Sequence, residues 1–306
     1  MITFFTTCKP FKQHGAIIQE NALWSWAQLQ KGCEIFVYGE ALGVPEICQK
    51  LNLTHLPNTP CEGNLPLISG MFADARLRAR NPILCYLNAD ILLPPHWLQW
   101  ISLVRSLPSY LAVGYRTDVA VAQLFSGNSS RELWEDLKKN GTRHGAAGID
   151  FFAFPKSLNW SIPPFVVGRP GWDNWMLWKA RREGIPLIDL SPAFPVYHQN
   201  HSLENFARGN TERDEAPESK RNKAYLFHPW AACTLLDCNY EVKQPSEQTA
   251  LPVESKTYFL RKKANWSESW QGLERIWMIY PDYAWFTAPF ARLLIKMRKF
   301  WRRYNS

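Results

Sequence analysis

An asparagine and an aspartate follow the apolar run Ile83–Leu87, where a buried strand is expected to end. They are Asn88 and Asp90. A carboxylate at such a strand end can bind a divalent cation that bridges diphosphate oxygens, since Mg²⁺ and Mn²⁺ prefer hard oxygen ligands. Asn88 is expected on the same face of the extended segment, where its amide can hold a ribose hydroxyl or a metal-bound water. The alternative is an aspartate that only forms a turn.

A second segment combines two glycines, a proline and an acid just before a predicted helix. Its sequence over residues 168–174 is Gly-Arg-Pro-Gly-Trp-Asp-Asn, and Asp173 falls near the N-terminus of that helix. One interpretation of Asp173 is a general base that deprotonates an acceptor hydroxyl. The other is a capping residue that satisfies free amide groups of the first helical turn.

Two histidines, His198 and His201, stand three residues apart in the polar segment Tyr197–His201, which is expected to form a loop. Imidazole binds Mn²⁺ and Zn²⁺ readily, and histidines at this spacing can share one edge of a loop. The pair therefore predicts metal ligands. Structural histidines are the alternative.

The segment Arg143–Asp150 is rich in glycine and enters a predicted strand. It does not have the sequence of a P-loop, and no dinucleotide-binding glycine motif occurs in a strand–helix context. Glycines such as Gly148 suit a close approach of the backbone to a ligand, and Asp150 can accept hydrogen bonds from sugar hydroxyls. A plain turn is the alternative.

Strands and helices alternate along the part of the chain that must position these residues. This pattern predicts an α/β fold with an open, mostly parallel sheet flanked by helices, and such sheets bind ligands at the carboxyl ends of their strands. The strands are expected at residues 2–7, 34–38, 53–56, 83–87, 110–115, 149–154 and 185–190, and the helices at 19–29, 67–80, 95–107, 131–140 and 172–183.

The formal net charge of +8 is concentrated near the C-terminus. Residues 283–306 include six basic residues and no acidic one, so the rest of the chain carries only +2. A nucleic-acid-binding core would carry the excess itself, so we expect no nucleic-acid partner. Two opposite stripes of a helix are formed by Phe290, Leu293, Leu294, Met297, Trp301 and Tyr304, and by Arg292, Lys296, Lys299 and Arg303. This segregation predicts a helix on an anionic membrane surface, or one packed on the main domain.

We expect one large domain over residues 1–240, a linker over 241–256 and the helical, aromatic and basic tail over 257–306. The N-terminus shows no signal-peptide pattern, and no apolar run approaches the ~18–20 residues that span a bilayer. Seven cysteines without a Cys-x-x-Cys pair indicate thiols in a reducing compartment. The expected location is cytoplasmic, with peripheral association at the inner face of the cell membrane.

Four ordered motifs between Met1 and about Asp237 resemble bacterial GT-A-type glycosyltransferase-like proteins of the nucleotide-diphospho-sugar transferase superfamily. They read YLNADI, HGAAGIDFFAFP, GRPGWDNW and HQNH, and they occupy Tyr86–Ile91, His144–Pro155, Gly168–Trp175 and His198–His201. The Gly-Trp-Asp of the third motif is also similar, as an analogy of fold, to the acidic catalytic segment of β-1,4-galactosyltransferases.

The resemblance implies a GT-A-like twisted sheet and transfer of a sugar from a nucleotide-sugar donor to a glycan or lipid-linked acceptor. It implies Asp90 with His198 or His201 as ligands of Mn²⁺ or Mg²⁺, although the usual Asp-x-Asp is reduced here to Asn-x-Asp. Asp173 is implied as the base of an inverting displacement, with Asp150 as the next candidate. The implied donor-binding residues are Thr6, Thr7, Glu40, Asn88, Asp90, Arg143, Gly148, Arg169 and Trp172.

Two other functions stay open at the level of the sequence. A sugar-1-phosphate nucleotidyltransferase has a related sheet, but the Gly-rich, Lys/Arg-containing signature of those enzymes is missing from Thr6–Pro10. A catalytically degenerate, sugar-binding relative would account for the missing first aspartate of Asp-x-Asp. The joint presence of Asp90, Asp173 and the two histidines argues against it.

Overall fold

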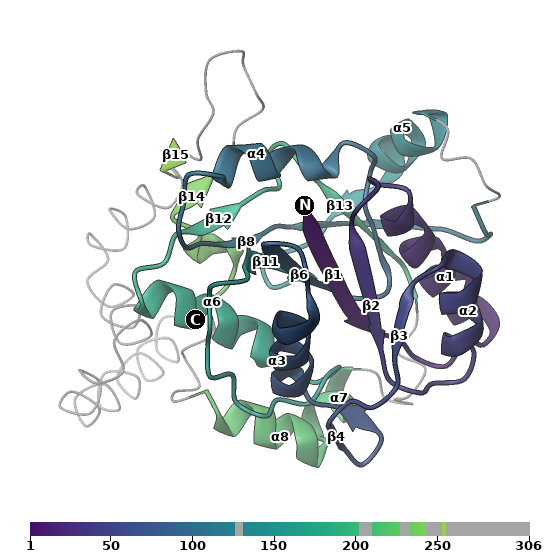
Figure 1. Ribbon diagram of the computed structural model, residues 1–306, viewed down its shortest axis with the longest axis horizontal. Coiled ribbons are helices and arrows are strands. Elements are labelled where there is room, and N and C mark those ends of the chain that lie inside the picture. The colour runs from purple at the N-terminus through teal and green to yellow at the C-terminus, as the bar shows by residue number, and fades with distance from the viewer. Residues whose placement is uncertain (126–130, 202–209, 227–232, 243–252, 255–306) are drawn as a thin grey trace, which may run out of the picture.

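In the computed structural model, the larger sheet orders its strands so that neighbours far apart in sequence lie side by side (Figure 1). The structure describes residues 1–125, 131–201, 210–226, 233–242 and 253–254. From one edge to the other, the strands described there are β15 (Val253–Glu254), β14 (Tyr240–Glu241), β12 (Leu187–Asp189), β8 (Leu111–Val113), β11 (Phe151–Pro155), β6 (Ile83–Leu87), β1 (Ile2–Thr7), β2 (Glu34–Tyr38) and β3 (Thr54–Leu56).

Most neighbouring strands of this sheet run parallel. The exceptions are β11, which is antiparallel to both β6 and β8, and the pair of β14 and β15 at one edge. The structure thus confirms the predicted α/β fold with an open, mostly parallel sheet flanked by helices. Because β11 runs backwards, its first residues lie beside the last residues of β6.

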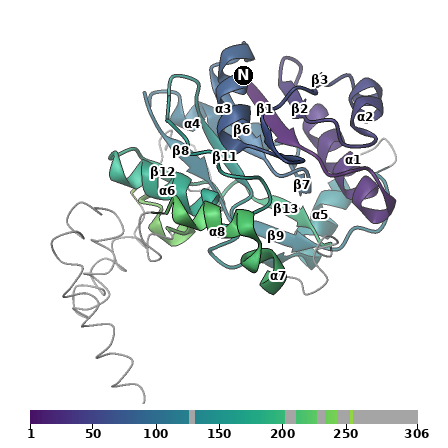
Figure 2. The same ribbon diagram turned by 90° about the horizontal axis from the view of Figure 1, so that it is seen from below.

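A smaller sheet lies beyond the carboxyl end of β6. Its order is β10 (Thr142–Arg143), β9 (Arg116–Val119), β13 (Val196–Gln199) and β7 (Ile91–Leu92), and Figure 2 shows β9 and β13 side by side. A separate hairpin joins β4 (Cys61–Glu62) to β5 (Leu65–Pro66). Since β6 continues through three residues into β7, the two larger sheets meet where β6 ends.

Helices cover both faces of the larger sheet. The described helices are α1 (Gln13–Ala27), α2 (Val44–Leu51), α3 (Ile68–Arg78), η1 (Trp97–Trp100), α4 (Ile101–Val104), α5 (Arg131–Asn140), α6 (Trp172–Arg182), α7 (Asn210–Glu215), α8 (Pro217–Ala224) and η2 (Leu235–Asp237). Apolar residues of α1, α2, η1 and α4 pack on one face, and those of α3 and α6 on the other.

Successive side chains of β1 point to opposite faces of the sheet, so the strand contributes to both apolar cores. Phe4 packs on one face, where its ring centroid lies 6.2 Å from that of Trp26 and 6.1 Å from that of Trp97. Phe5 points to the other face and meets Phe72 of α3 edge-on at 4.9 Å. Complete burial of each large apolar side chain contributes roughly 1.5–3 kcal/mol, so these clusters hold the sheet rigid beneath the polar residues at its carboxyl edge.

The predicted strands of the larger sheet and most of the predicted helices agree with the structure, although α1 begins at Gln13 and not at residue 19. The helices α2, α7 and α8, the hairpin of β4 and β5 and the edge strands β14 and β15 were not predicted. The smaller sheet differs most from the prediction. Residues 197–199 were expected to lie in a polar loop, and this is wrong because β13 pairs with β9 on one side and β7 on the other. The strand β9 was not predicted either. Its four residues are Arg-Thr-Asp-Val, and three of them are only partly buried, so they form no apolar run that would identify a strand.

The C-terminal part of the chain lies almost wholly outside the described residues. Within the predicted linker 241–256, residues 241 and 253–254 pair at the edge of the larger sheet, and the predicted tail 257–306 is not described. Among the described helices, none has the length and apolar character needed to cross a membrane. The seven cysteines are all in the described part, and none forms a disulfide.

Candidate functional site

Asp90 lies in the turn between β6 and β7, where the two sheets meet. A hydrogen bond of 3.2 Å from the amide of Ile91 to the carbonyl of Asn88 closes this turn. The carbonyl of Asp90 accepts two hydrogen bonds from Gln199 of β13, one from its amide at 3.1 Å and one from its Nε2 at 3.2 Å. The backbone of Asp90 is therefore held in place by the neighbouring strand.

Both predicted histidine ligands face the Asp90 carboxylate. His201 Nε2 lies 3.0 Å from Asp90 Oδ2, and His198 Nε2 lies 3.7 Å from the same oxygen. One potential ligand atom from each of the three residues lies within 4.8 Å of the others. The structure therefore brings together the three residues that the sequence predicted as metal ligands.

These three side chains fit a divalent cation. Asp90 Oδ1 is buried without a hydrogen-bond partner among the described residues, and a bound cation would satisfy it. Burial raises the pKa of Asp90, but the hydrogen bond with His201 and the electrostatic interaction with His198 lower the pKa by more than burial raises it. The pKa therefore lies below its ordinary value. An ionised carboxylate and two imidazoles form a donor set that suits Mn²⁺ or Zn²⁺.

A carboxylate that the sequence analysis did not select, Asp118 of β9, borders this cluster. Its Oδ1 lies 3.0 Å from His198 Nδ1 and 3.0 Å from Arg116 Nε, and its Oδ2 lies 2.7 Å from His144 Nδ1. The first two contacts are ion-pair distances without the alignment of a hydrogen bond. Burial raises the pKa of Asp118, but the bond with His144 and the charge of Arg116 bring it below its ordinary value.

Asp150 and Asn88 are joined to the same network. Asn88 Nδ2 donates to Asp150 Oδ1 at 2.7 Å, and Asn88 Oδ1 accepts from the Tyr86 hydroxyl at 3.2 Å. Arg116 donates to Asp150 Oδ2 at 3.0 Å. Each carboxylate oxygen of Asp150 therefore has a protein partner. Asn88 likewise uses both ends of its amide within the protein rather than presenting them to the cation site.

Asp173 lies in the first turn of α6, behind Gly171, whose φ of 110° places it in the left-handed region. Asp173 Oδ1 accepts hydrogen bonds from the amides of Gly171 at 3.2 Å and Asn174 at 2.9 Å. Among the described residues its Oδ2 has no partner. Burial raises the pKa of Asp173 to about 6, helped by the negative charge of Asp150 and opposed by the two amides. Asp173 can therefore cap the helix through Oδ1 and still offer Oδ2 for reaction.

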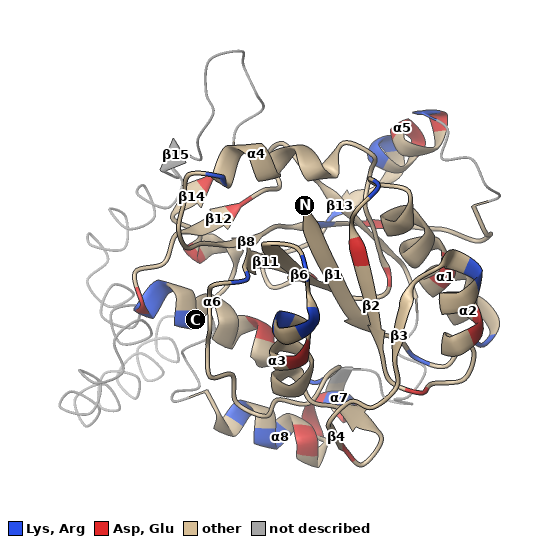
Figure 3. Ribbon diagram, in the orientation of Figure 1, with Lys and Arg blue, Asp and Glu red and all other residues tan. Residues whose placement is uncertain are grey.

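The charges along α6 follow the helix dipole. Asp173 is in the first turn, and Lys179, Arg181 and Arg182 occupy the last one, as the red and blue segments of α6 in Figure 3 show. Acidic groups at the N-terminus and basic groups at the C-terminus of a helix each stabilise it by roughly 0.3–1 kcal/mol. The carboxylate of Asp173 and these three cations therefore lie at opposite ends of α6.

Three of the residues predicted to bind the donor, Thr6, Thr7 and Trp172, have other contacts in the structure, and a fourth, Glu40, is exposed. The Thr6 hydroxyl donates to the Leu87 carbonyl at 2.6 Å, and the Thr7 hydroxyl to the Tyr38 carbonyl at 2.9 Å. Trp172 is buried in the core around α6. Glu40 is exposed just after β2. Their roles in donor binding stay predictions.

The remaining predicted donor-binding residues are Arg143, Arg169 and Gly148. Arg143 lies 3.9 Å above the ring of Tyr115, and Arg169 Nε lies 3.6 Å from a carboxylate oxygen of Glu218 on α8. A Cβ at Gly148 would stand 2.4 Å from His144 Cδ2. Glycine at this position therefore lets the His144 ring approach the backbone.

Three residues of this site were missed by the sequence analysis as individual candidates: Arg116, Asp118 and His144. The sequence feature that could have identified Arg116 and Asp118 was their spacing, since residues two apart in a strand share one face. A short Arg-x-Asp pair is common in any sequence, and it gains meaning only when β13 places His198 opposite Asp118.

Comparisons with known proteins give likeness only at the level of structure. No protein-family model matches the sequence, and no curated protein matches it. A structure of S. aureus TarS 1-349 in complex with UDP is similar with a TM-score of 0.44 and 14% identity, over 65% of this chain and 60% of that one. M. tuberculosis glucosyl-3-phosphoglycerate synthase is similar with a TM-score of 0.45 and 15% identity, over 74% of this chain and 79% of that one.

A putative nucleotide-diphospho-sugar transferase from Desulfovibrio desulfuricans G20 has a TM-score of 0.38 and 11% identity, over 73% of this chain and 95% of that one. The alignments span only 36% to 60% of the TarS chains. At these identities and at TM-scores below 0.5, the likenesses carry no argument about this chain.

Proposed function

We propose that this protein is a glycosyltransferase that moves a sugar from a nucleoside-diphosphate sugar to a hydroxyl of a glycan or glycolipid, with inversion at the transferred carbon. The observation that supports this most is the cluster of Asp90, His198 and His201 at the end of β6, with the unpartnered Oδ1 of Asp90. The product would serve a bacterial surface polysaccharide or glycolipid.

Transfer requires that the charge of the departing nucleoside diphosphate be neutralised. When a divalent cation is bound to Asp90, His198 and His201, it supplies this electrostatic stabilisation. Arg143 and Arg169 are proposed to add positive charge near the phosphates.

Asp173 is proposed to remove the proton of the acceptor hydroxyl. Its pKa of about 6 leaves it ionised at neutral pH, yet basic enough to take a proton in the transition state. Its Oδ1 is held by two amides of the helix start, which fixes the carboxylate while Oδ2 takes the proton. The acceptor oxygen then attacks the sugar carbon as the bond to the diphosphate breaks, which inverts that carbon.

Asp150 is the weaker candidate for the base. Both of its oxygens are engaged, by Asn88 and Arg116, and freeing either would leave a partner without its hydrogen bond. We propose that Asp150 holds these two side chains and that it raises the pKa of Asp173 through its charge.

One observation favours a second candidate, a sugar-binding relative without transferase activity. Asn88 stands where the family has the first carboxylate of Asp-x-Asp, and its amide is tied to Tyr86 and Asp150. The cation would then have a single carboxylate ligand. A protein that binds a nucleotide sugar in Mn²⁺ but never releases the nucleotide, with any acceptor, would have this second function.

The test begins with thermal-shift measurements of the full chain with UDP-, GDP-, CMP- and dTDP-sugars, each with Mn²⁺ and with EDTA. At least one donor should raise the melting temperature in Mn²⁺ more than in EDTA. Asp90→Ala should weaken binding of that donor in Mn²⁺ and change little in EDTA. Equal affinities of both proteins in both conditions would remove the cation from the mechanism.

Transfer itself is measured as release of the nucleoside diphosphate with candidate glycan and lipid-linked acceptors. Asp74→Asn is the matched control for the loss of a carboxylate, since Asp74 on α3 accepts hydrogen bonds from Arg78 of the same helix and from Tyr38 of β2, and from no residue of the network. This control should bind and release like the unaltered protein.

A further inference from the structure

Asp118 holds together side chains from three neighbouring strands. It lies on β9, directly opposite His198 of β13 in the parallel register, so both side chains project from the same face of the smaller sheet. Arg116, two residues earlier on β9, shares that face. His144 follows β10, and its amide donates to the Arg116 carbonyl at 3.0 Å. The backbone of the smaller sheet therefore places these side chains around Asp118.

The two nitrogens of the His198 ring have different neighbours. Nδ1 lies 3.0 Å from Asp118 Oδ1, whereas Nε2 lies 3.7 Å from Asp90 Oδ2. His198 is buried, with 9% of the residue's surface exposed. A carboxylate beside one ring nitrogen fixes the orientation of an imidazole and leaves the other nitrogen to bind a metal.

Asp118 is itself prevented from turning. Its second oxygen is bonded to His144 at 2.7 Å, and Arg116 Nε lies 3.0 Å from its first. Arg116 is fixed in turn by its bond to Asp150. Rotation of the Asp118 carboxylate toward Asp90 would break the contacts with His144 and Arg116 and bring two negative charges together.

We propose that Asp118 is a positioning residue that holds His198 with Nε2 directed at the Asp90 carboxylate, and that it thereby sets the affinity of the cation site. The inference rests on the proposed function for the identity of the site. It adds a residue that binds neither the cation nor the donor. His144 in turn helps to hold Asp118, because His144 is bonded to the Asp118 oxygen that does not face His198.

The experiment titrates the full-length protein with Mn²⁺ alone, by calorimetry, in the absence of any nucleotide. Asp118→Asn keeps the size of the side chain but replaces the charged acceptor beside His198. It should weaken Mn²⁺ binding by ~10–100-fold, the usual effect of losing such an outer partner. His144→Gln should weaken it less than Asp118→Asn does. Asp74→Asn, which also removes an ion-paired carboxylate, should leave it unchanged.

The outcomes separate this inference from the proposed function. Failure of the unaltered protein to bind Mn²⁺ would overturn the cation site itself. Normal binding by the unaltered protein and by Asp118→Asn would overturn only the role of Asp118. Complete loss in Asp118→Asn, equal to the loss in Asp90→Ala, would make Asp118 a direct ligand and overturn its positioning role. If Asp118→Asn does not fold, as judged by its melting curve in EDTA, His144→Gln decides, since unchanged affinity there contradicts the proposal.

Discussion

Replacing Asp173 with asparagine should make the protein more stable at neutral pH and should greatly slow sugar transfer. The Oδ1 of the substituted side chain can still accept the hydrogen bonds from the amides of Gly171 and Asn174, so the start of α6 keeps its cap. The negative charge and the proton-accepting oxygen are lost. The substitution therefore separates the capping role of Asp173 from its proposed role as a base.

The magnitude follows from the pKa of Asp173, which burial raises from 3.8 to about 6. At 1.36 kcal/mol for each pKa unit, holding the ionised carboxylate in the fold costs at most about 3 kcal/mol at pH 8. Because the folded pKa is raised, the wild-type protein is relatively most stable below pH 3.8 and loses this contribution as the pH rises through 6. Between pH 5 and pH 8 the loss is about 1.4 kcal/mol, and asparagine at this position should not show it.

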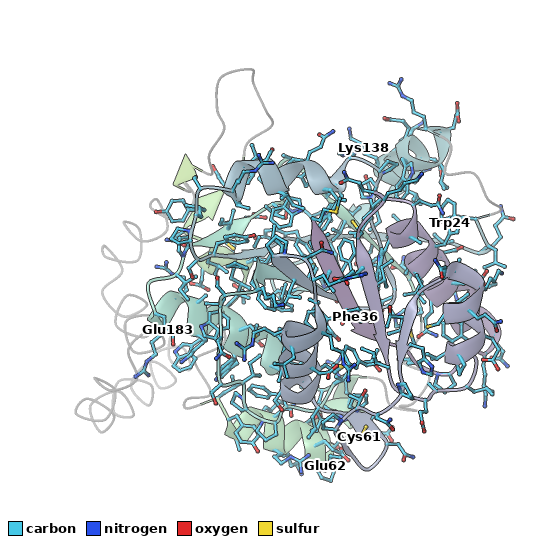
Figure 4. All side chains as sticks on the ribbon, viewed as in Figure 1. Trp24, Phe36, Cys61, Glu62, Lys138 and Glu183 are labelled. Carbon is cyan, nitrogen blue, oxygen red and sulfur yellow. The ribbon has the colours of Figure 1, made fainter. Side chains whose placement is uncertain are left out.

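The assay compares denaturant unfolding of wild type and Asp173→Asn at pH 5 and pH 8, alongside nucleotide release at pH 8. The stability difference should grow by about 1.4 kcal/mol between the two pH values, while the rate falls ~10²–10⁴-fold at nearly unchanged donor affinity. Glu183→Gln, at the opposite end of α6 (Figure 4), is the matched control and should keep full activity. Normal turnover in Asp173→Asn would refute its role as a base, and a less stable variant would show that capping by the charged form dominates.

Three further outcomes concern Asp173, Asn222 of α8 and the C-terminal tail. The rate should rise with pH up to about 6 and then level off, because Asp173 must be ionised; a profile that is flat from pH 4.5 to 8 would contradict this. Asn222→Ala should lower the free energy of unfolding by roughly 3–5 kcal/mol, since it leaves the buried amide and carbonyl of Val166 unpaired; a loss under 1 kcal/mol in denaturant unfolding would contradict it. Removing residues 283–306, which lie outside the described residues, should abolish salt-sensitive sedimentation with anionic liposomes, and binding that survives the truncation would assign the tail another role.

The central strands of the larger sheet were predictable because they are nearly continuous apolar runs, whereas the edge strands β14 and β15, with two residues each, were not predicted. Ile83–Leu87 is buried at every residue, and such a run identifies a central strand without knowledge of its partners. Asp90 could be predicted as a site residue because it comes three positions after the end of this strand. The antiparallel direction of β11 could not be predicted, because an apolar run such as Phe151–Pro155 does not indicate the direction of the strand in the sheet.

The smaller sheet could not be predicted, and the network around Asp118 depends on it. Its strands have two to four residues each, too few to show a periodicity. They pair segments that are far apart in sequence, such as Asp118 with His198. The polarity that made Tyr197–His201 look like a loop has another origin: His198 lies beside the carboxylates of Asp118 and Asp90, and Gln199 donates hydrogen bonds to backbone carbonyls of other elements. Residue type alone identified the two histidines as candidate ligands. Asp118, the second carboxylate beside them, could be identified only once the pairing of β9 with β13 was known.

The expected preference for one cation over another depends on the hydrogen bonds that occupy the Asn88 amide. Its amide is committed to Tyr86 and Asp150, so the ligands that remain are the Asp90 carboxylate and the imidazoles of His198 and His201. Mg²⁺ favours oxygen ligands and keeps its waters, whereas imidazole nitrogens favour Mn²⁺ and later metals. We therefore expect the unaltered protein to bind Mn²⁺ at least tenfold more tightly than Mg²⁺ in calorimetry, and His201→Asp to narrow that preference by replacing a nitrogen with an oxygen. Equal affinity for the two ions, or a preference that His201→Asp leaves unchanged, would show that the histidines do not bind the cation. Asp90 would then have to hold the cation with oxygens supplied by the donor alone.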